Sequence, residues 1–124
     1  MSVRAYTEFR GLRDVSPPAY LTTSATPLIY VPPERRAYIE KVMVTSSDTV
    51  NNYVLLGQLS GTTFTPLLPP IQLPAGQTVT IPSDRLPSAF VYSSATQINA
   101  WAAATAAAPS SSTAISIVIE VVYA

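Results

Sequence analysis

Short runs of hydrophobic residues with a period of two recur along this chain, separated by proline, serine and glycine. In the clearest run, residues 114–123, one face consists of Ile115, Ile117, Ile119, Val121 and Tyr123, and the other of Ser116, Val118, Glu120 and Val122. Alternation of this kind predicts a β-strand with a buried face. Because a slip of one residue would exchange the two faces, we expect the register of this strand to be firmly set.

Similar runs predict further strands at residues 28–31, 37–45, 53–59, 77–81, 89–93 and 97–102. In the run 37–45, one predicted face holds Tyr38, Glu40, Val42 and Val44, and the other holds Ile39, Lys41 and Met43. The sequence Ser46-Ser47-Asp48 is a turn signal. The runs on either side of it are therefore candidates for pairing as a hairpin.

Proline marks the stretches that do not fit a central strand. Residues 64–73 contain Pro66, Pro69 and Pro70, and proline cannot donate to a ladder, so this segment belongs at a sheet edge or in a loop. In the sequence 73–76 proline is second and glycine is fourth, which suits a type I turn.

The alanine-rich stretch 100–108 has two interpretations. Alanine is the best helix former, so a short helix is one of them. The strand-like residues 97–99 before it and Pro109 with three serines after it favour the other, a strand that runs into a long hairpin loop of small residues. We prefer the loop.

About eight short strands in one chain of 124 residues predict an all-β, single-domain β-sandwich with jelly-roll-like connections. Alternation alone leaves the strand order open, since immunoglobulin-like sandwiches alternate in the same way. The first residues, up to Pro17-Pro18, mix arginines with aromatic residues and look like an extended arm. We therefore predict an extended N-terminal arm over residues 1–20 and a sandwich domain over residues 21–124.

Composition narrows the function. The chain has no histidine and no cysteine, and seven basic residues balance seven acidic ones. Neither a disulfide framework nor a Ser-His, Cys-His or zinc site can form, so we expect no enzyme, no cofactor and no metal. Lys41 is better explained as a solvated or interface residue than as a base, and a calcium site that uses Asp48 or Asp84 stays open as an alternative.

The absence of net charge predicts neither nucleic acid nor membrane as a partner. The first 14 residues carry charges and no apolar run, so we expect synthesis in a cytoplasm and no secretory signal. Proteins close to zero net charge tend to associate, which favours assembly with other chains.

Two charged features remain as candidate contacts. In the arm, the residues predicted to bind a partner are Arg4, Tyr6, Phe9, Arg10 and Arg13, a mixture of bidentate donors and apolar anchors. The alternative is a frayed terminus. The cluster Glu34-Arg35-Arg36 is either a solvated turn, which we prefer, or a contact with acids of a neighbouring subunit.

Three stretches carry a resemblance to a known family: PLIYVPPERRAYIEKVMVTSSDTVNNYVLLGQL, IQLPAGQTVTIP and INAWAAATAAAPSSSTAISIVIEVVY. In order and spacing they resemble small virion proteins of tailed bacteriophages, over roughly residues 27–123. The resemblance implies a β-sandwich on a phage particle, as a head decoration or cement protein or as a tail or fibre component. It implies no catalytic residues.

We therefore predict a capsid decoration protein, made in the host cytoplasm and located on the capsid surface of the virion. Its expected partners are the major capsid protein and further copies of itself, as a trimer. The sandwich would form a rigid body while the arm lies across an adjacent subunit. The alternative is a receptor- or glycan-binding module of a tail or fibre, which predicts exposed aromatic residues such as Trp101 or Tyr92 on loops at one end.

Overall fold

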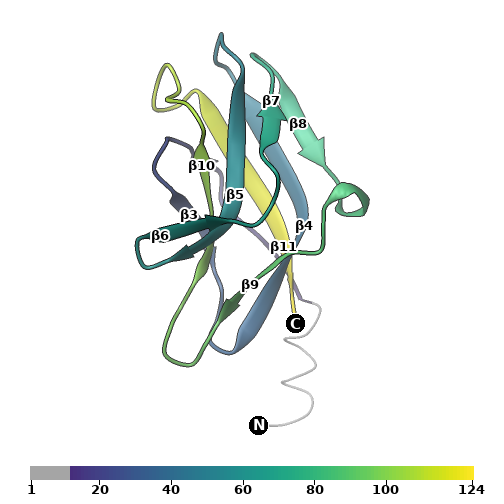
Figure 1. The fold of residues 1–124 in the computed structure, drawn as a ribbon. Helices are drawn as coiled ribbons and strands as arrows, with labels where there is room; N and C mark the ends of the chain where they lie inside the picture. Colours follow the sequence, from purple (N-terminus) through teal and green to yellow (C-terminus); the bar gives the residue numbers. More distant parts are fainter. Residues whose placement is uncertain (1–11) are drawn as a thin grey trace.

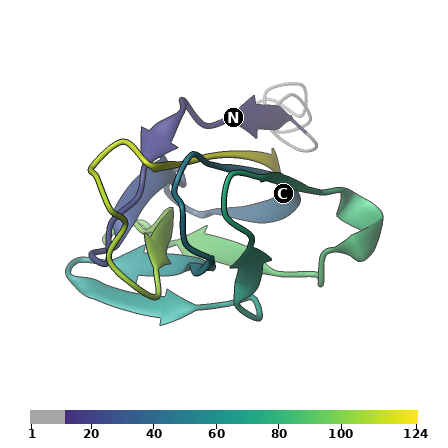
Figure 2. The ribbon, with the colours of Figure 1, turned by 90° about the horizontal axis from the view of Figure 1, so that it is seen from above.

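Two antiparallel sheets stack face to face and confirm the predicted all-β sandwich (Figures 1 and 2). This computed structural model describes residues 12–124. Sheet A contains β1 (Arg13–Val15), β2 (Ala19–Tyr20), β4 (Arg35–Ser46), β8 (Thr78–Ile81), β9 (Phe90–Ser93) and β11 (Ile115–Tyr123). Sheet B contains β3 (Thr26–Tyr30), β5 (Asn52–Ser60), β6 (Thr63–Pro66), β7 (Ile71–Leu73) and β10 (Ala100–Thr105). A 3₁₀ helix, η1 (Ser83–Arg85), lies between β8 and β9.

The strand order is that of a jelly roll. β1 and β2 both pair with β11, β8 and β9 both pair with β4, and β6 and β7 both pair with β5. When each of these interrupted pairs is counted as one strand, sheet A has the order 1-8-3-6 and sheet B the order 2-7-4-5. This interleaving is the double Greek key of a jelly roll, and it decides the question that alternation left open.

Both predicted hairpins are wrong. The strands on either side of Ser46-Ser47-Asp48, β4 and β5, lie in different sheets, and so do β10 and β11, on either side of the small-residue loop. In a jelly roll these connections cross between the two sheets. A turn signal shows where the chain changes direction. It does not show which strands pair, because this depends on the sheet in which each strand buries its apolar face.

The alanine-rich stretch forms a strand and no helix, and this strand begins and ends three residues later than the predicted strand 97–102. β10 continues to Thr105 and pairs with β3 on one side and β5 on the other, and each of its six residues is buried. Pairing on both sides outweighs the helix propensity of alanine, which amounts to fractions of a kcal/mol per residue. The segment after Thr105 is a loop, as preferred from the sequence.

The predicted faces of β4 are correct for only part of the strand. In the second half of β4, Val42 and Val44 are buried on the same face, as predicted. In the first half the buried residues are Ala37 and Ile39, and not Tyr38 and Glu40. The reason is a β-bulge: Lys41 lies opposite Glu120 and Ile39 lies opposite Val121, so Glu40 is an extra residue. An inserted residue reverses the alternation beyond it.

The turn before β8 is displaced by one residue from its predicted position. The amide of Gln77 donates to the carbonyl of Pro74 at 3.3 Å, so Gly76 takes the third position of the turn. Its φ of 68° excludes type I and fits type II, which favours glycine there.

The sandwich begins before the predicted boundary at residue 21. β1 pairs with β11 through Arg13 and Val122, and the Leu12 carbonyl accepts a hydrogen bond from the Tyr123 amide at 2.9 Å. The Ser16 hydroxyl accepts a further one from the Ile119 amide. Residues 13–20 thus form the first edge of sheet A. Of the predicted arm residues, Arg4, Tyr6, Phe9 and Arg10 lie outside the described part of the chain.

One continuous core fills the space between the sheets. The whole predicted inner face of β11 is buried, as expected, and Trp101 of β10 is fully buried. The Trp101 indole nitrogen donates to the Ala37 carbonyl at 2.7 Å, across the core from sheet B to sheet A. A buried indole needs such a partner, so this bond fixes how the two sheets face each other.

We predict that Trp101→Phe lowers the free energy of unfolding by about 2–4 kcal/mol, because it leaves a cavity and removes the partner of a buried carbonyl. Urea unfolding followed by circular dichroism measures the change. Tyr53→Phe, at a residue 48% exposed on sheet B, is the control and should shift the midpoint little. Equal stability of Trp101→Phe and the wild type would contradict the role of this contact.

Candidate interaction surface

Arg13 is where the predicted arm meets the described structure. It lies in β1, and its Nη1 is 3.0 Å from Glu120 Oε1 and 3.9 Å from Glu40 Oε2. The Arg13 side chain is 61% exposed. Exposed pairs of this kind add only about 0–1 kcal/mol to stability, so the cluster matters more for what it presents to solvent. Its role in binding a partner stays a prediction.

The Arg13 cluster lies on the outer surface of sheet A, which we call face A. Its apolar and aromatic members, exposed or half-buried, are Val15, Tyr38, Met43, Phe90, Val118 and Val122. Its charged members are Arg13, Arg36, Glu40, Lys41 and Glu120. Cross-strand pairing holds this surface together, since Tyr38 lies between Val122 of β11 and Phe90 of β9.

Aromatic and arginine side chains stack at one end of face A. The ring centroids of Tyr38 and Phe90 are 5.2 Å apart, and the Arg36 guanidinium carbon lies 5.2 Å from the Phe90 centroid. Both distances are within the range of favourable ring and cation–π contacts. Arg36 is thus part of a surface cluster with aromatic rings. Of the predicted charge cluster, Glu34 is exposed in the turn before β4, whereas Arg35 and Arg36 lie in the strand itself, so the solvated-turn interpretation is correct for Glu34 alone.

Face A is hollowed in two places. One hollow of about 340 Å³ is lined by residues that include Tyr38, Leu86, Pro87 and Val122. The other, of about 170 Å³, is lined by Val15, Lys41, Met43, Val118, Ile119 and Glu120. Hollows of this size can accommodate side chains of another protein.

The outer surface of sheet B is different. In β10, Trp101 faces the core between the sheets, and alternate residues face outward. The outward residues are nevertheless buried: Ala100, Ala102 and Ala104. A Cβ on Gly57 would lie 2.0 Å from the Thr65 carbonyl oxygen and 2.6 Å from the Pro66 Cα, so the chain itself packs closely against this strand. Part of sheet B is therefore covered by its own chain, which leaves face A as the more open sheet surface.

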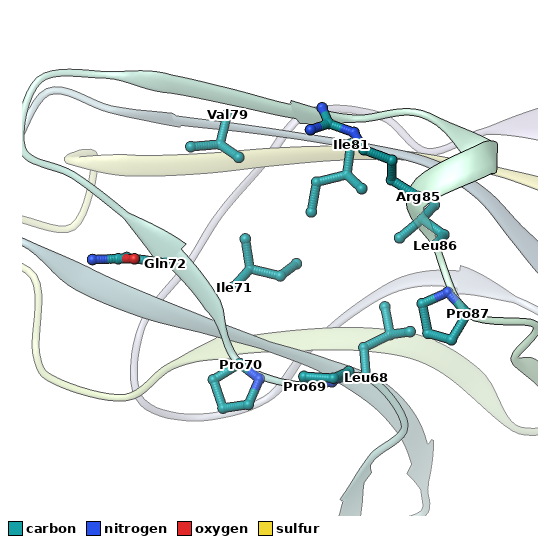
Figure 3. A pocket seen from close by; sticks show the side chains of 10 residues that line it. All are labelled: Leu68, Pro69, Pro70, Ile71, Gln72, Val79, Ile81, Arg85, Leu86 and Pro87. Atoms are coloured by element: carbon teal, nitrogen blue, oxygen red, sulfur yellow. The ribbon is translucent and has the colours of Figure 1, made fainter.

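A third feature is an apolar groove at the edge of the sandwich, between β8 of sheet A and β7 of sheet B (Figure 3). Its volume is about 330 Å³. Val79, Ile81 and Leu86 point into it from one side, and Ile71 and Leu68 from the other (Figure 3). We call it the edge groove. Arg85 and Gln72 are the polar side chains of its lining.

Asp48 is committed to the structure rather than to a ligand. The carboxylate is 4% exposed and accepts hydrogen bonds from the Ser110 amide at 3.0 Å and the Ser110 hydroxyl at 2.7 Å. It thereby joins the β4–β5 loop to the β10–β11 loop. Across residues 12–124 no group of three or more potential metal-ligating His, Cys, Asp or Glu side chains occurs, and no helix is long and apolar enough to cross a membrane.

The aromatic residues named for the receptor-binding alternative do not lie on loops. Trp101 is fully buried in β10, so it cannot serve as a binding platform. Tyr92 is 42% exposed but lies in β9. Face A and the edge groove are not among the features that the sequence predicts. The outward residues of β4 and β11 were a signal for the first, but only the strand order shows that they form one surface.

The geometry defines a jelly-roll sandwich with an open sheet face and an apolar edge groove. Among solved structures, a similar chain occurs in the acidic stable capsid structure of Helicobacter pylori bacteriophage KHP30. The TM-score is 0.50 at 15% sequence identity, over 92% of this chain and 88% of that chain. At this identity the likeness shows a common fold. No family model and no curated protein matches the sequence.

Acid should weaken the fold through Asp48. Hydrogen bonds from Ser110, and further ones from the Thr49 and Val50 amides, hold the pKa of Asp48 below its usual value near 3.8, against the opposing effect of burial. A lowered folded-state pKa stabilises the protein above the unfolded-state value, and this contribution is lost as the pH falls through the folded-state pKa.

We therefore predict that Asp48→Asn is less stable than the wild type at pH 7 and loses less of its stability between pH 6 and pH 3. Urea midpoints measured across this range check both expectations. Asp84→Asn, in η1 and without buried contacts, serves as the control. A wild-type pH profile retained in Asp48→Asn would show that this carboxylate does not carry the effect.

Proposed function

We propose that this chain is a structural virion protein of a bacteriophage, which decorates a capsid and cements the shell formed by the major capsid protein. The observation that carries the proposal is the jelly-roll fold shared along nearly the whole chain with a chain of a phage capsid structure. The resemblance of residues 27–123 to small virion proteins supports it independently. The protein would lie on the capsid surface.

Face A is the surface that fits a capsid subunit best. Protein interfaces are enriched in aromatic residues, methionine and arginine. Met43 and Phe90 are 39% and 41% exposed, and Arg36 lies beside Phe90. The charged residues around Arg13 carry both signs and would set the orientation of the contact more than its strength.

The proposal includes no catalysis and no cofactor. The chain contributes binding energy alone, and many copies on one shell add up their contributions. A protein that binds only the assembled shell stabilises it by mass action, in proportion to the logarithm of the ratio of its concentration to Kd. The arm residues Arg4, Tyr6, Phe9 and Arg10 are the proposed anchor to an adjacent subunit, and the functional form is a homo-oligomer, with a trimer as the expected size.

Sedimentation with capsids tests the proposal. The purified protein is mixed with undecorated shells of the phage that carries it and, separately, with unassembled major capsid protein. We expect the protein to sediment with the shells only and to raise the temperature at which they break, measured by light scattering. Absence from shells, or specific binding to cell-surface glycans instead, would overturn the proposal in favour of a receptor-binding module.

Face A makes a sharper prediction. Met43→Glu places a negative charge in the smaller hollow and should weaken shell binding by about tenfold or more, since a desolvated unpaired charge costs over 1.4 kcal/mol. Tyr53→Glu is the matched control, because Tyr53 is a similarly exposed strand residue on the outside of sheet B. If Tyr53→Glu weakens binding more than Met43→Glu, face A is not the contact.

A further inference from the structure

The edge groove lies beside a strand edge that pairs with no further strand within residues 12–124. β8 pairs with β4 on one side, and β7 pairs with β5, so both strands that flank the groove are the last of their sheets. Five aliphatic side chains and three prolines line the groove between them (Figure 3). An open edge above an apolar groove is the geometry to which an extended segment adds as a further strand.

The backbone groups of Thr78 and Thr80 are the ones that face this open edge. The Ser46 amide donates to the Gln77 carbonyl at 2.9 Å, which makes these two residues a hydrogen-bonded pair of the β4–β8 ladder. Such pairs alternate, so the amides and carbonyls of residues 78 and 80 point away from β4. Consistently, the Arg85 guanidinium lies 3.5 Å from the Thr80 carbonyl oxygen on that side.

The edge accepts only a short strand. β8 ends at Ile81, directly before Pro82, and Pro69 and Pro70 precede β7 at the same end of the groove. Proline has no amide hydrogen, so it blocks strand pairing at this end, and the 74–77 turn ends β8 at the other. The opening is therefore about four residues long and leads directly to the apolar groove.

The first residues of the chain have the matching sequence pattern. Residues 3–10 read Val-Arg-Ala-Tyr-Thr-Glu-Phe-Arg, in which Val3, Ala5, Thr7 and Phe9 alternate with Arg4, Tyr6, Glu8 and Arg10. In a strand this places small and apolar residues on one face and mainly charged residues on the other. The first face suits the groove, and the second suits solvent.

The strand order directs this segment away from the groove of its own copy. β1 is antiparallel to β11 and β11 to β4, so β1 runs in the same direction as β4. The chain enters β1 at the end of the sheet where β4 begins, beside Tyr123, whereas β8 pairs with the far half of β4, at residues 42–45. Figure 1 shows the C-terminus at the lower end of the sandwich and β8 in the upper half.

The distance leads to the same conclusion. β1 and β8 are separated by two strands, or about 14 Å across sheet A, and β8 begins about 15 Å further along it. With Phe9 in the groove, only residues 10–12 would be left to span this diagonal of about 20 Å, and the four steps from residue 9 to Arg13 reach at most about 14 Å. A neighbouring copy, in contrast, can place its own β8 edge where the chain leaves β1.

From these observations we propose that the segment 3–10 of one copy adds a short strand of about four residues to β8 of a second copy, with Phe9 in the edge groove. The contact joins two different surfaces, so it forms a ring where the rotation between copies closes, and a dimer where two copies exchange their arms mutually. This inference deepens the proposed function, because it assigns the adjacent subunit that the arm binds to another copy of this chain. Copies linked in this way would clasp the shell together.

Light scattering on a sizing column tests the exchange. The full-length protein should form an oligomer, and deletion of residues 1–10 should leave a folded monomer. Thr80→Pro removes an amide that faces the arm but not the ladder to β4, so it should also give a monomer. Thr80→Val keeps the amide and should remain oligomeric. A monomeric wild type, or an oligomer that survives arm deletion, would overturn the inference.

Cross-linking locates the contact in case Thr80→Pro disturbs the fold. The chain has no cysteine, so copies with Thr7→Cys can be mixed with larger, tagged copies with Thr80→Cys and treated with a short bismaleimide. We expect a band at the sum of the two masses. Tagged Thr63→Cys, an exposed position on β6, is the control and should give none. The double variant in one chain should link between copies; a link within one copy would mean that the arm occupies its own groove.

The outcome can be separated from that of the proposed function. If the arm is not exchanged but the protein still sediments with shells, only this inference fails. If the oligomer forms as expected but binds no shell, the arm exchange stands and the capsid role fails.

Discussion

The ladder between β4 and β11 is the constraint on which the rest of this structure depends. It is the longest pairing in the described chain and runs through the middle of sheet A. It fixes which side chains of both strands face the core, and the bulge at Glu40 keeps Ala37 and Ile39 buried together with Val42 and Val44. The other strands of sheet A attach to one side of this pair or the other.

The same ladder positions the surfaces that carry the proposed function. The outward residues of β4 and β11 form the centre of face A, and the edges of the pair separate β1 from β8. Because the two strands run antiparallel, the chain enters sheet A at the end opposite to β8. The arm exchange proposed above would therefore join the first edge of sheet A in one copy to the β8 edge of another copy. A sandwich with few charged groups can assemble in this way without a specific chemical site.

The contact between Trp101 and Ala37 links this ladder to sheet B. It is a hydrogen bond inside an apolar core, where an unpaired indole or carbonyl would be costly. At the loop end of the sandwich, Asp48 performs a similar task between the β4–β5 and β10–β11 loops. These two polar contacts thus tie together elements that are far apart in the sequence.

Much of the fold was determined by the sequence alone. The inner face of β11, the class of fold and most strands follow from local alternation and from proline, which act within a few residues. The pairing of the strands did not follow from these local patterns. β4 and β5 are separated by a turn signal, yet they lie in different sheets. The stretch Ala100–Thr105 is a strand because β3 and β5 flank it. The phase of β4 likewise depended on a bulge opposite Glu120. Only the tertiary structure decided these points, and with them face A and the edge groove, because each depends on contacts between residues distant along the chain.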